Sequence, residues 1–309
     1  MKFTLLLSTL LFLGLGCTPA PKVISDFVPT QGKATAPNDE DASTQGPFER
    51  RLQTAISYDG LSYVSNSGWI SDQANVPDAV VTQDGTLYLY YSGWVVGDRL
   101  NSSAVAISQD NGVSWTYHYI EMNGAESLHL PADPDVVLLN DGTFRMYFTS
   151  SQTGGNISIY YGESMDGINF EYKGVIISLP DRQALDSTTF KIGDTWHMYA
   201  LSDKGVDELW HLTSTDGVIF EVYGLTSFPY DGKSYVPSNG VWIENKFHLM
   251  LFHPREASIV SMWTKNGLDW YPDEGTRLDP TEEETYVHDS TIVPLKNGQS
   301  LMIYTTNTP

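Results

Sequence analysis

Three aspartates hold the same place in a repeated sequence pattern and are the first candidates for chemistry. They are Asp133, Asp186 and Asp289, in the segments Asp-Pro-Asp, Asp-Ser-Thr and Asp-Ser-Thr. Carboxylates that converge on a concave centre repel one another and lose part of their hydration, so their pKa values separate. Because one such group can then donate a proton while another accepts one, this arrangement suits the cleavage of a glycosidic bond.

Two related segments, Val76-Pro77-Asp78 and Val236-Pro237-Ser238, have the same form but begin with valine. Taken together, the five segments predict a ring of strand entrances around one central axis. Asp78 and Asp135 lie one pleat beyond the ring position. We expect both to contact the substrate.

The elements that must position these residues are repeated hairpins. The pattern Ser/Thr-x-Asp/Asn-Gly-x-x-aromatic occurs five times, once with an extra residue, and its glycines stand 50 to 55 residues apart. The five copies are residues 57–63, 108–115, 164–170, 214–220 and 264–270. Asp-Gly between two short apolar runs indicates a tight hairpin, because glycine accepts the positive φ that the turn needs.

A second set of turns interleaves with the first. They are Asp84-Gly85, Asp141-Gly142, Gly193-Asp194, Glu244-Asn245 and Asn297-Gly298. Each repeat therefore holds two hairpins, or four strands, which is the content of one propeller blade. We predict an all-β chain that folds over residues 48–309 as a five-bladed β-propeller with four-stranded blades. A β-sandwich is the competing fold, and five matched pairs of hairpins argue against it.

The order of the hairpins predicts how the ring closes. The folded region opens with a hairpin of the outer type, residues 53–65, and ends with one of the inner type, residues 289–306. We expect the two to share one sheet, so that the N-terminal strands complete the last blade and leave no open inner edge. The tight hairpins then lie on one face of the disc and the longer loops on the other, where function usually resides.

The N-terminal residues indicate export. Lys2 precedes an apolar run, residues 3–15, of signal-peptide length, and Cys17 is the only cysteine. This arrangement resembles a bacterial lipoprotein signal, with residues 1–16 removed and Cys17 lipidated. An ordinary secretory signal is the alternative. Residues 17–47 have the composition of a disordered tether. We therefore expect a lipoprotein of the bacterial cell envelope, at the outer membrane or cell surface, that touches the membrane through its lipid alone.

The charge balance excludes some partners. The chain has 17 basic and 38 acidic residues, a net charge of −21. A charge of this sign repels phosphate backbones, so we expect no binding to nucleic acid. We expect a monomer whose partner is a carbohydrate, and we predict no metal ion or other cofactor.

The Asp-Pro entrances, the Asp-Gly hairpins and the five blades resemble the propeller glycoside hydrolases of families 43 and 32, which include arabinanases and β-xylosidases. The resemblance spans residues 53–306. It implies that Asp133 is the catalytic base and that Asp186 orients the reacting groups and sets their pKa values. It also implies an acidic glutamate in the next blade, where this chain instead has Val236-Pro237-Ser238-Asn239.

Other carboxylic acids could replace the missing glutamate. Asp289 is the first candidate because it holds the equivalent ring position, and Glu256 on a neighbouring loop is the second. Glu126 and Glu284 stand on further loops. Four more residues are expected to contact the substrate: Trp94, His288, Arg255 and Arg182. An anionic sugar is the alternative substrate, because Arg99, Arg182 and Arg255 could together bind its negative charge.

A non-catalytic role competes with hydrolysis. Aspartates at crowded strand entrances often serve only to accept hydrogen bonds from neighbouring backbone N–H groups. Many propellers bind ligands without transforming them, since a fold does not fix a function. The alternative is therefore a propeller that binds a glycan or a protein.

Overall fold

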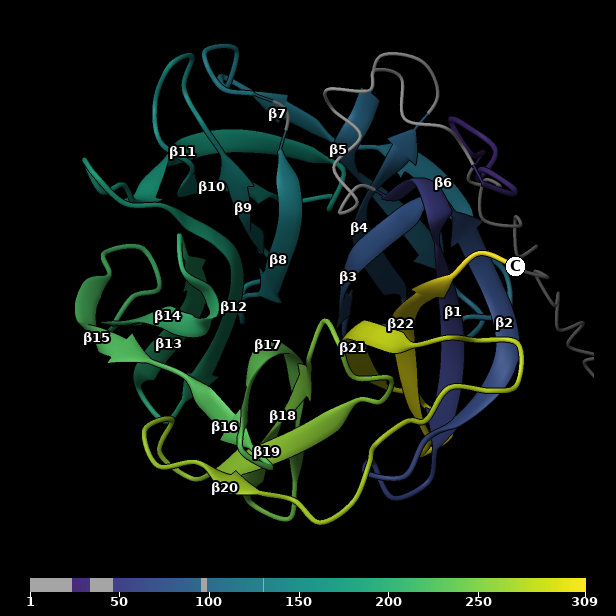
Figure 1. Cartoon of the computed structure of the whole chain (residues 1–309). Helices are drawn as coiled ribbons and strands as arrows, with labels where there is room; N and C mark the ends of the chain where they lie inside the picture. Colours follow the sequence, from purple (N-terminus) through teal and green to yellow (C-terminus); the bar gives the residue numbers. More distant parts are fainter. Residues whose placement is uncertain (1–23, 34–46, 96–98, 130) are drawn as a thin grey trace, which may run out of the picture.

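The computed structural model describes residues 24–33, 47–95, 99–129 and 131–309, and the side chains of residues 94, 95 and 99–102 are left undescribed. Five β-sheets surround a central axis, as Figure 1 shows. The predicted five-bladed β-propeller is confirmed. The predicted signal peptide and Cys17 lie outside the described residues.

The first two blades follow one another along the chain. Blade 1 contains, from the axis outwards, β3 (Ala74–Val81), β4 (Leu87–Val95), β5 (Arg99–Ser108) and β6 (Thr116–Tyr119). Blade 2 contains β8 (Ala132–Leu138), β9 (Phe144–Ser150), β10 (Ser158–Ser164) and β11 (Asn169–Ile177). A fifth strand, β7 (Glu121–Asn123), pairs in parallel with the outer edge of β11, which the sequence did not predict.

Blades 3 and 4 repeat the same plan. Blade 3 contains β12 (Ala184–Ile192), β13 (Thr195–Ser202), β14 (Gly205–Ser214) and β15 (Glu221–Thr226). Blade 4 contains β17 (Lys233–Ile243), β18 (Lys246–Phe252), β19 (Val260–Thr264) and β20 (Tyr271–Pro272). The short β16 (Phe228–Tyr230) pairs with the start of β17 as an additional strand.

Blade 5 joins the two ends of the propeller. A short 3-10 helix, η1 (Pro47–Glu49), leads into β1 (Arg50–Ser57), and β2 (Val64–Asp72) follows. β1 pairs with β22 (Ser300–Asn307), which pairs with the inner strand β21 (Val287–Pro294). The predicted closure of the last blade by the N-terminal strands is confirmed.

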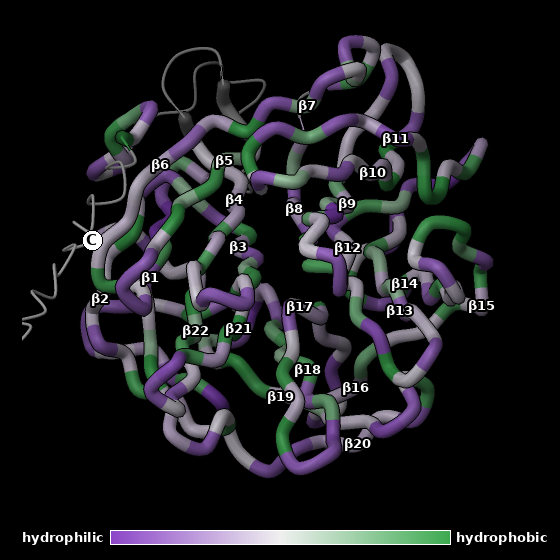
Figure 2. Tube along the Cα trace, turned by 180° about the vertical axis from the view of Figure 1, so that it is seen from behind, coloured by the Kyte–Doolittle hydropathy of each residue, from purple (hydrophilic) through white to green (hydrophobic). Residues whose placement is uncertain are grey.

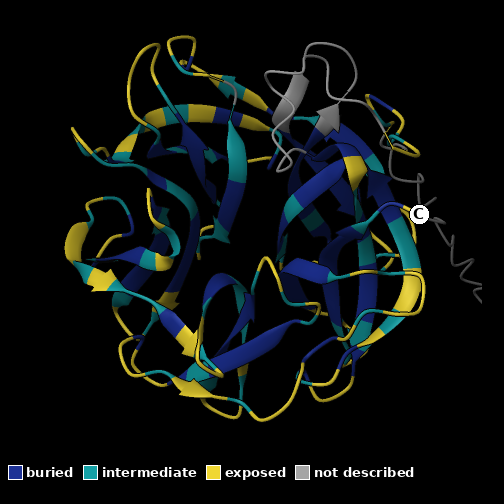
Figure 3. Cartoon of the chain, viewed as in Figure 1, coloured by how far each residue is buried: buried dark blue, intermediate teal, exposed yellow. Residues whose placement is uncertain are grey.

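The core lies between the blades. Five clusters of buried apolar side chains each fill the interface between two neighbouring blades, such as the one that joins Leu89 of blade 1 to Ile303 of blade 5. Hydrophilic and hydrophobic residues alternate along many strands (Figure 2), because successive side chains point to opposite faces of a sheet. Buried residues are concentrated in the strands and exposed ones in the connecting loops (Figure 3).

The Asp-Gly hairpins also fasten neighbouring blades. The hydroxyl of Tyr147 in blade 2 donates a hydrogen bond of 2.6 Å to the carbonyl of Gly217 in the outer hairpin of blade 3. Tyr90 and Tyr199 bind Gly167 and Gly267 in the same way. The repeated turn therefore joins neighbouring blades as well as reversing the chain.

Residues 24–33, which the sequence assigns to the tether, are packed against the propeller. Phe27 is buried beside Tyr117 and Tyr119, and the backbone N–H of Asp26 donates to the carbonyl of Tyr117 at 2.8 Å. This stretch therefore contributes to the folded domain. No helix in the described part of the chain is long and apolar enough to cross a membrane.

Candidate functional site

The innermost strands carry β-bulges where they enter the ring. Bulges in β8, β12 and β21 put Asp133, Asp186 and Asp289 in the left-handed backbone region, with φ of 48°, 52° and 35°. Aspartate tolerates this conformation better than most residues. Val76 adopts it in β3 with φ of 49°, although a β-branched side chain disfavours it. A bulge redirects a side chain, and here it recurs at the predicted ring position.

Blade 4 departs from the predicted alignment. The sequence placed Val236 in the ring, but the bulge of β17 falls between Pro237 and Gly240, two residues later than the pattern predicts. Blade 4 therefore presents Ser238 and Asn239 to the centre. Gly240 allows this local register, because an added Cβ would lie 2.7 Å from the carbonyl oxygen of His248.

Hydroxyl groups of the preceding blade fix two of the bulges. The backbone N–H of Asp133 donates to Ser92 Oγ, and that of Asp186 donates to Thr149 Oγ1, each at 2.9 Å. Both hydroxyls stand on the second strand of the blade before. The position of each aspartate is therefore set by its own bulge and by contact with its neighbour.

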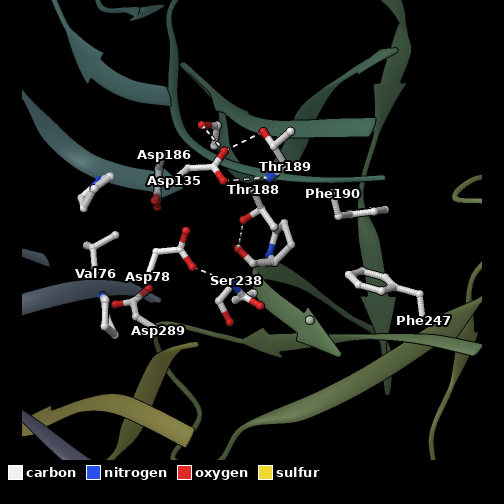
Figure 4. A pocket seen from close by; sticks show the side chains of 16 residues that line it. Val76, Asp78, Asp135, Asp186, Thr188, Thr189, Phe190, Ser238, Phe247 and Asp289 are labelled. Carbon is white, nitrogen blue, oxygen red and sulfur yellow. Dashed lines mark hydrogen bonds between the residues drawn. The ribbon is translucent and has the colours of Figure 1, made fainter. Parts of the chain in front are cut away.

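A small cavity lies at the centre of the ring. Its volume is about 90 Å³, and its polar lining includes Asp78, Asp135, Asp186 and Asp289 (Figure 4). Phe190 and Phe247, whose ring centroids are 4.4 Å apart, lie away from these aspartates. Typical ligand pockets measure about 300–1,000 Å³. The cavity can hold water, but a sugar ring would have to bind at its mouth.

Asp78 and Asp135, which the sequence predicts to contact the substrate, line the cavity and also tie the blades together. Asp78 Oδ2 accepts the backbone N–H of Val136 in blade 2 at 2.5 Å, and its Oδ1 accepts Asn239 Nδ2 of blade 4 at 2.5 Å. Asp135 accepts the backbone N–H of Thr189 in blade 3 at 3.1 Å, and also the hydroxyl of Thr189 at 2.6 Å. These carboxylates are buried, and internal donors occupy them.

The electrostatic environment shifts the pKa values of the other three aspartates, Asp133, Asp186 and Asp289. Burial raises the pKa of Asp186 well above its ordinary value, and the charges of Asp133 and Asp289 raise it further. Burial also raises the pKa of Asp133. Burial raises the pKa of Asp289 to about 6, and the nearby guanidinium of Arg50 opposes this rise. Arg50 Nη1 lies 3.9 Å from Asp289 Oδ2.

The carboxylates of Asp78 and Asp135, which join the blades, make the stability of the fold depend on pH. Burial raises the pKa of Asp78 to about 6, and burial with the charge of Asp78 raises that of Asp135 to about 8. A raised folded-state pKa means that ionisation costs folding free energy. This cost is absent below the ordinary value of 3.8 and complete above about pH 8. At the acid end, Asp166 has a pKa lowered to about 2 by hydrogen bonds despite its desolvation, so its contribution is lost below about pH 4.

We therefore expect the melting temperature to fall by roughly 5 °C between pH 5.5 and pH 8.5. Thermal unfolding monitored by circular dichroism at both pH values measures this change. The Asp135→Asn variant should show a smaller fall, because it removes the group with the higher pKa. A melting temperature that is constant or rises over this range would contradict the assignment.

Of the remaining predicted residues, Glu256, His288, Arg255 and Arg182 are not among those that line the cavity. Glu256 is on an exposed loop, where an ion pair with Lys233 lowers its pKa. Its backbone carbonyl accepts a hydrogen bond of 2.9 Å from Nε2 of the buried His288. Arg255 is exposed, and Arg182 forms ion pairs with Asp203 and Glu208 and lies over the ring of Trp210. The side chains of Trp94 and Arg99 lie outside the described part of the structure.

Sequence reasoning missed two polar residues near the ring. Arg50 reaches Asp289 from β1, some 240 residues earlier in the chain, and no local pattern marks it. Asn239 was seen only as the residue where a glutamate was expected, although its amide binds Asp78 across the ring. Among the described residues, no three His, Cys, Asp or Glu side chains are grouped so as to hold a metal ion.

No family model matches the chain, and no curated protein matches it in sequence. Solved structures do share its fold. A thermostable family-43 glycoside hydrolase is 17% identical with a TM-score of 0.62, over 76% of this chain and 84% of that one. An α-L-arabinofuranosidase from Clostridium thermocellum is 17% identical with a TM-score of 0.57, over 75% and 81%. An N-acetylgalactosamine deacetylase from F. plautii, solved with blood group B trisaccharide, is 18% identical with a TM-score of 0.57, over 78% and 81%. The resemblance inferred from the sequence is thus confirmed at the level of the fold.

Proposed function

We propose that this protein is a glycoside hydrolase, tethered to the cell surface through Cys17, that cleaves glycans at the mouth of the central cavity. The convergence of Asp133, Asp186 and Asp289 on one ring, with Arg50 beside only one of them, carries this proposal. The similar structures support it, since several are described as glycoside hydrolases.

Asp186 is the best candidate for the general acid. Its pKa is raised by burial and by the charges of neighbouring carboxylates, and the cation Arg50 is not among the groups that act on it. A carboxyl group in this setting retains its proton near neutral pH. It can therefore donate that proton to the oxygen of the departing sugar. This role differs from the orienting role that the family resemblance implies for Asp186.

Asp289 is the best candidate for the general base. Arg50 favours its ionised form, which opposes the effect of burial. Asp133 is not among the residues that line the cavity, but its charge acts on both Asp186 and Asp289. We therefore assign Asp133 the role of adjusting the pKa values of the reacting pair. This differs from the base role that the family resemblance implies for Asp133, and from the acid role for which the sequence put Asp289 first. Asp289 would activate a water molecule, for which the central cavity provides space.

The substrate is a neutral glycan. Three arginines were considered for an anionic sugar, and two of them have described side chains. Arg182 is committed to Asp203 and Glu208, and Arg255 is exposed and does not line the cavity. Arg50 is paired with Asp289. The aspartate ring would therefore repel a uronic acid, and we expect arabinans, xylans or galactans to be better substrates than polygalacturonate.

The test is release of reducing sugar from a panel of neutral and acidic glycans by the purified chain. The Asp133→Asn, Asp186→Asn and Asp289→Asn variants run beside it. Glu256→Gln is the matched control, since this acid is partly exposed, does not line the cavity and is paired with Lys233. Activity that disappears in the ring variants and persists in Glu256→Gln supports the proposal. A folded wild-type protein that releases sugar from none of these glycans rejects it.

The pair of Arg50 and Asp289 predicts a change in the pH profile. Arg50→Gln removes the cation that favours ionised Asp289, so the pKa of this base rises. We expect the acidic limb of the kcat/KM profile to move upwards by about one pH unit. Arg50→Lys should restore most of the wild-type profile. The control Arg255→Gln should leave it unchanged, and an unshifted limb in Arg50→Gln would exclude Asp289 as the base.

The small cavity favours one other function. With about 90 Å³ at its centre and Ser238 and Asn239 where a glutamate was expected, the ring could support binding without cleavage. A glycan-binding propeller would bind members of the same panel and release no sugar. Binding measured beside hydrolysis separates the two functions.

A further inference from the structure

A surface groove lies at the outer edge of blade 5, away from the aspartate ring. Trp69 and Asp72 of β2 line it together with Arg51 of β1, and Gln31, Gly32, Thr308 and Pro309 complete it. Its volume is about 380 Å³, several times that of the central cavity and within the usual range of ligand pockets. β2 is the outermost strand of its sheet, and the C-terminus lies beside it (Figure 1).

A single buried carboxylate organises this groove. Asp72 Oδ1 accepts Arg51 Nε at 2.5 Å and Trp69 Nε1 at 3.0 Å. Asp72 Oδ2 accepts Arg51 Nη2 at 3.0 Å and the backbone N–H of Gly32 at 2.6 Å. These four bonds fix the indole ring and the guanidinium group before any ligand arrives. A site that is ordered in advance loses less conformational entropy when it binds.

The segment containing Gln31 is also held in place. The backbone N–H of Asp72 donates a hydrogen bond of 3.0 Å to the carbonyl oxygen of Thr30. Thr30 Oγ1 donates to Asp72 O at 2.6 Å, and Gln73 Nε2 donates to Gly32 O at 2.9 Å. Hydrogen bonds to Asp72 and Gln73 therefore hold the segment that carries Gln31 against blade 5.

The chemistry of the groove selects an uncharged, polar ligand. The charges of Arg51 and Asp72 compensate each other, and hydrogen bonds, against the effect of desolvation, keep the pKa of Asp72 below its usual range. The hydrogen bonds described for Arg51 use Nε and Nη2, which leaves Nη1 for a ligand. The exposed side chain of Gln31 adds an amide donor and acceptor. Trp69 adds an aromatic surface, against which the C–H face of a sugar ring can pack.

We propose that this groove binds one or two residues of a neutral glycan, at a site separate from the aspartate ring. The groove would retain a polymer on the protein whether or not the ring cleaves it. The inference therefore does not depend on hydrolysis. A polymer would gain affinity from simultaneous contact with both places, because the second contact is intramolecular.

The experiment measures binding of soluble arabinan, xylan and galactan by affinity gel electrophoresis, and of their oligosaccharides by calorimetry. Trp69→Ala should weaken binding at least tenfold. Gln31→Ala, at an exposed position outside the sheets, should weaken it two- to fivefold without altering stability. Trp69→Phe, which keeps an apolar ring but loses the bond to Asp72, should have an intermediate affinity.

Two controls separate this groove from other sites. Trp242→Ala removes another tryptophan, half-exposed at the end of β17, and should bind as the wild type does. Asp186→Asn alters the ring and should bind oligosaccharides at the groove with unchanged affinity. The proposal is overturned if the wild type binds none of these glycans, if Trp69→Ala and Gln31→Ala both bind normally, or if Asp186→Asn alone abolishes binding. A wild-type protein that binds these glycans at the groove but releases no sugar would reject the proposed hydrolysis without affecting the groove proposal.

Discussion

Asp186→Asn is expected to lower kcat for sugar release by about 10²- to 10⁴-fold while the propeller stays folded. The amide cannot donate the proton that the departing sugar oxygen needs. The fold should tolerate the change, because the ionised form of Asp186 is disfavoured by burial and by neighbouring carboxylates. Replacing this carboxyl with an uncharged group of the same shape removes that cost. We expect the melting temperature to be unchanged or slightly higher.

Steady-state kinetics and thermal unfolding on the same preparation test this prediction. The control Glu256→Gln removes a partly exposed carboxylate whose pKa an ion pair with Lys233 lowers. It should keep near-normal activity. If Asp186→Asn remains active and Asp289→Asn does not, the roles of acid and base are assigned to the wrong residues. If both remain active, the ring is not the catalytic site.

The second large effect is on stability. Asp78→Ala should lower the free energy of unfolding by about 3 kcal/mol. Asp78 accepts hydrogen bonds from the backbone N–H of Val136, from Asn239 and from Thr291, and so joins blade 1 to three other blades. The substitution leaves these donors buried without an acceptor. The gain from removing a buried charge with a pKa near 6 offsets only part of this loss.

Urea unfolding followed by tryptophan fluorescence measures the change. Asp84→Ala is the matched control, because Asp84 is also an aspartate of blade 1 but lies in the exposed turn between β3 and β4. Its carboxylate accepts hydrogen bonds only within its own turn, and its loss should cost much less. Equal stability of the two variants would show that Asp78 does not fasten the blades. We therefore expect the Asp186 substitution to lower activity and the Asp78 substitution to lower stability, which distinguishes a carboxylate that acts in catalysis from one that supports the fold.

The hairpins show what the local sequence encodes. Positive φ values of 74°, 73° and 73° occur at Gly167, Gly217 and Gly267, where the Asp-Gly pattern predicted tight turns. The alternation of apolar residues between these turns then specifies strands with one buried face. Both signals extend over only a few residues, and so the blade number and the closure by β1 could be predicted without coordinates.

The ring was predictable only where the bulge follows the pattern. Asp133, Asp186 and Asp289 lie at bulges of their strands, as their shared sequence position indicated. In blade 4 the bulge is displaced towards Gly240, because strand register depends on packing against β18. Sequence comparison among the blades cannot detect such a shift, since both registers satisfy the same apolar pattern.

The sequence by itself determined the repeat, the fold and the three aspartates at the ring, because each depends on residues close together in the chain. Only the tertiary structure decided the hydrogen-bond partners and the charged neighbours of each carboxylate. Asp78 and Asp135 are occupied by donors from other blades, and Arg50 reaches Asp289 from a strand at the other end of the folded chain. The protonation and hydrogen bonding of a buried acid depend on every charge and dipole within a few ångströms. Those neighbours are brought together by closure of the ring, not by nearness in sequence.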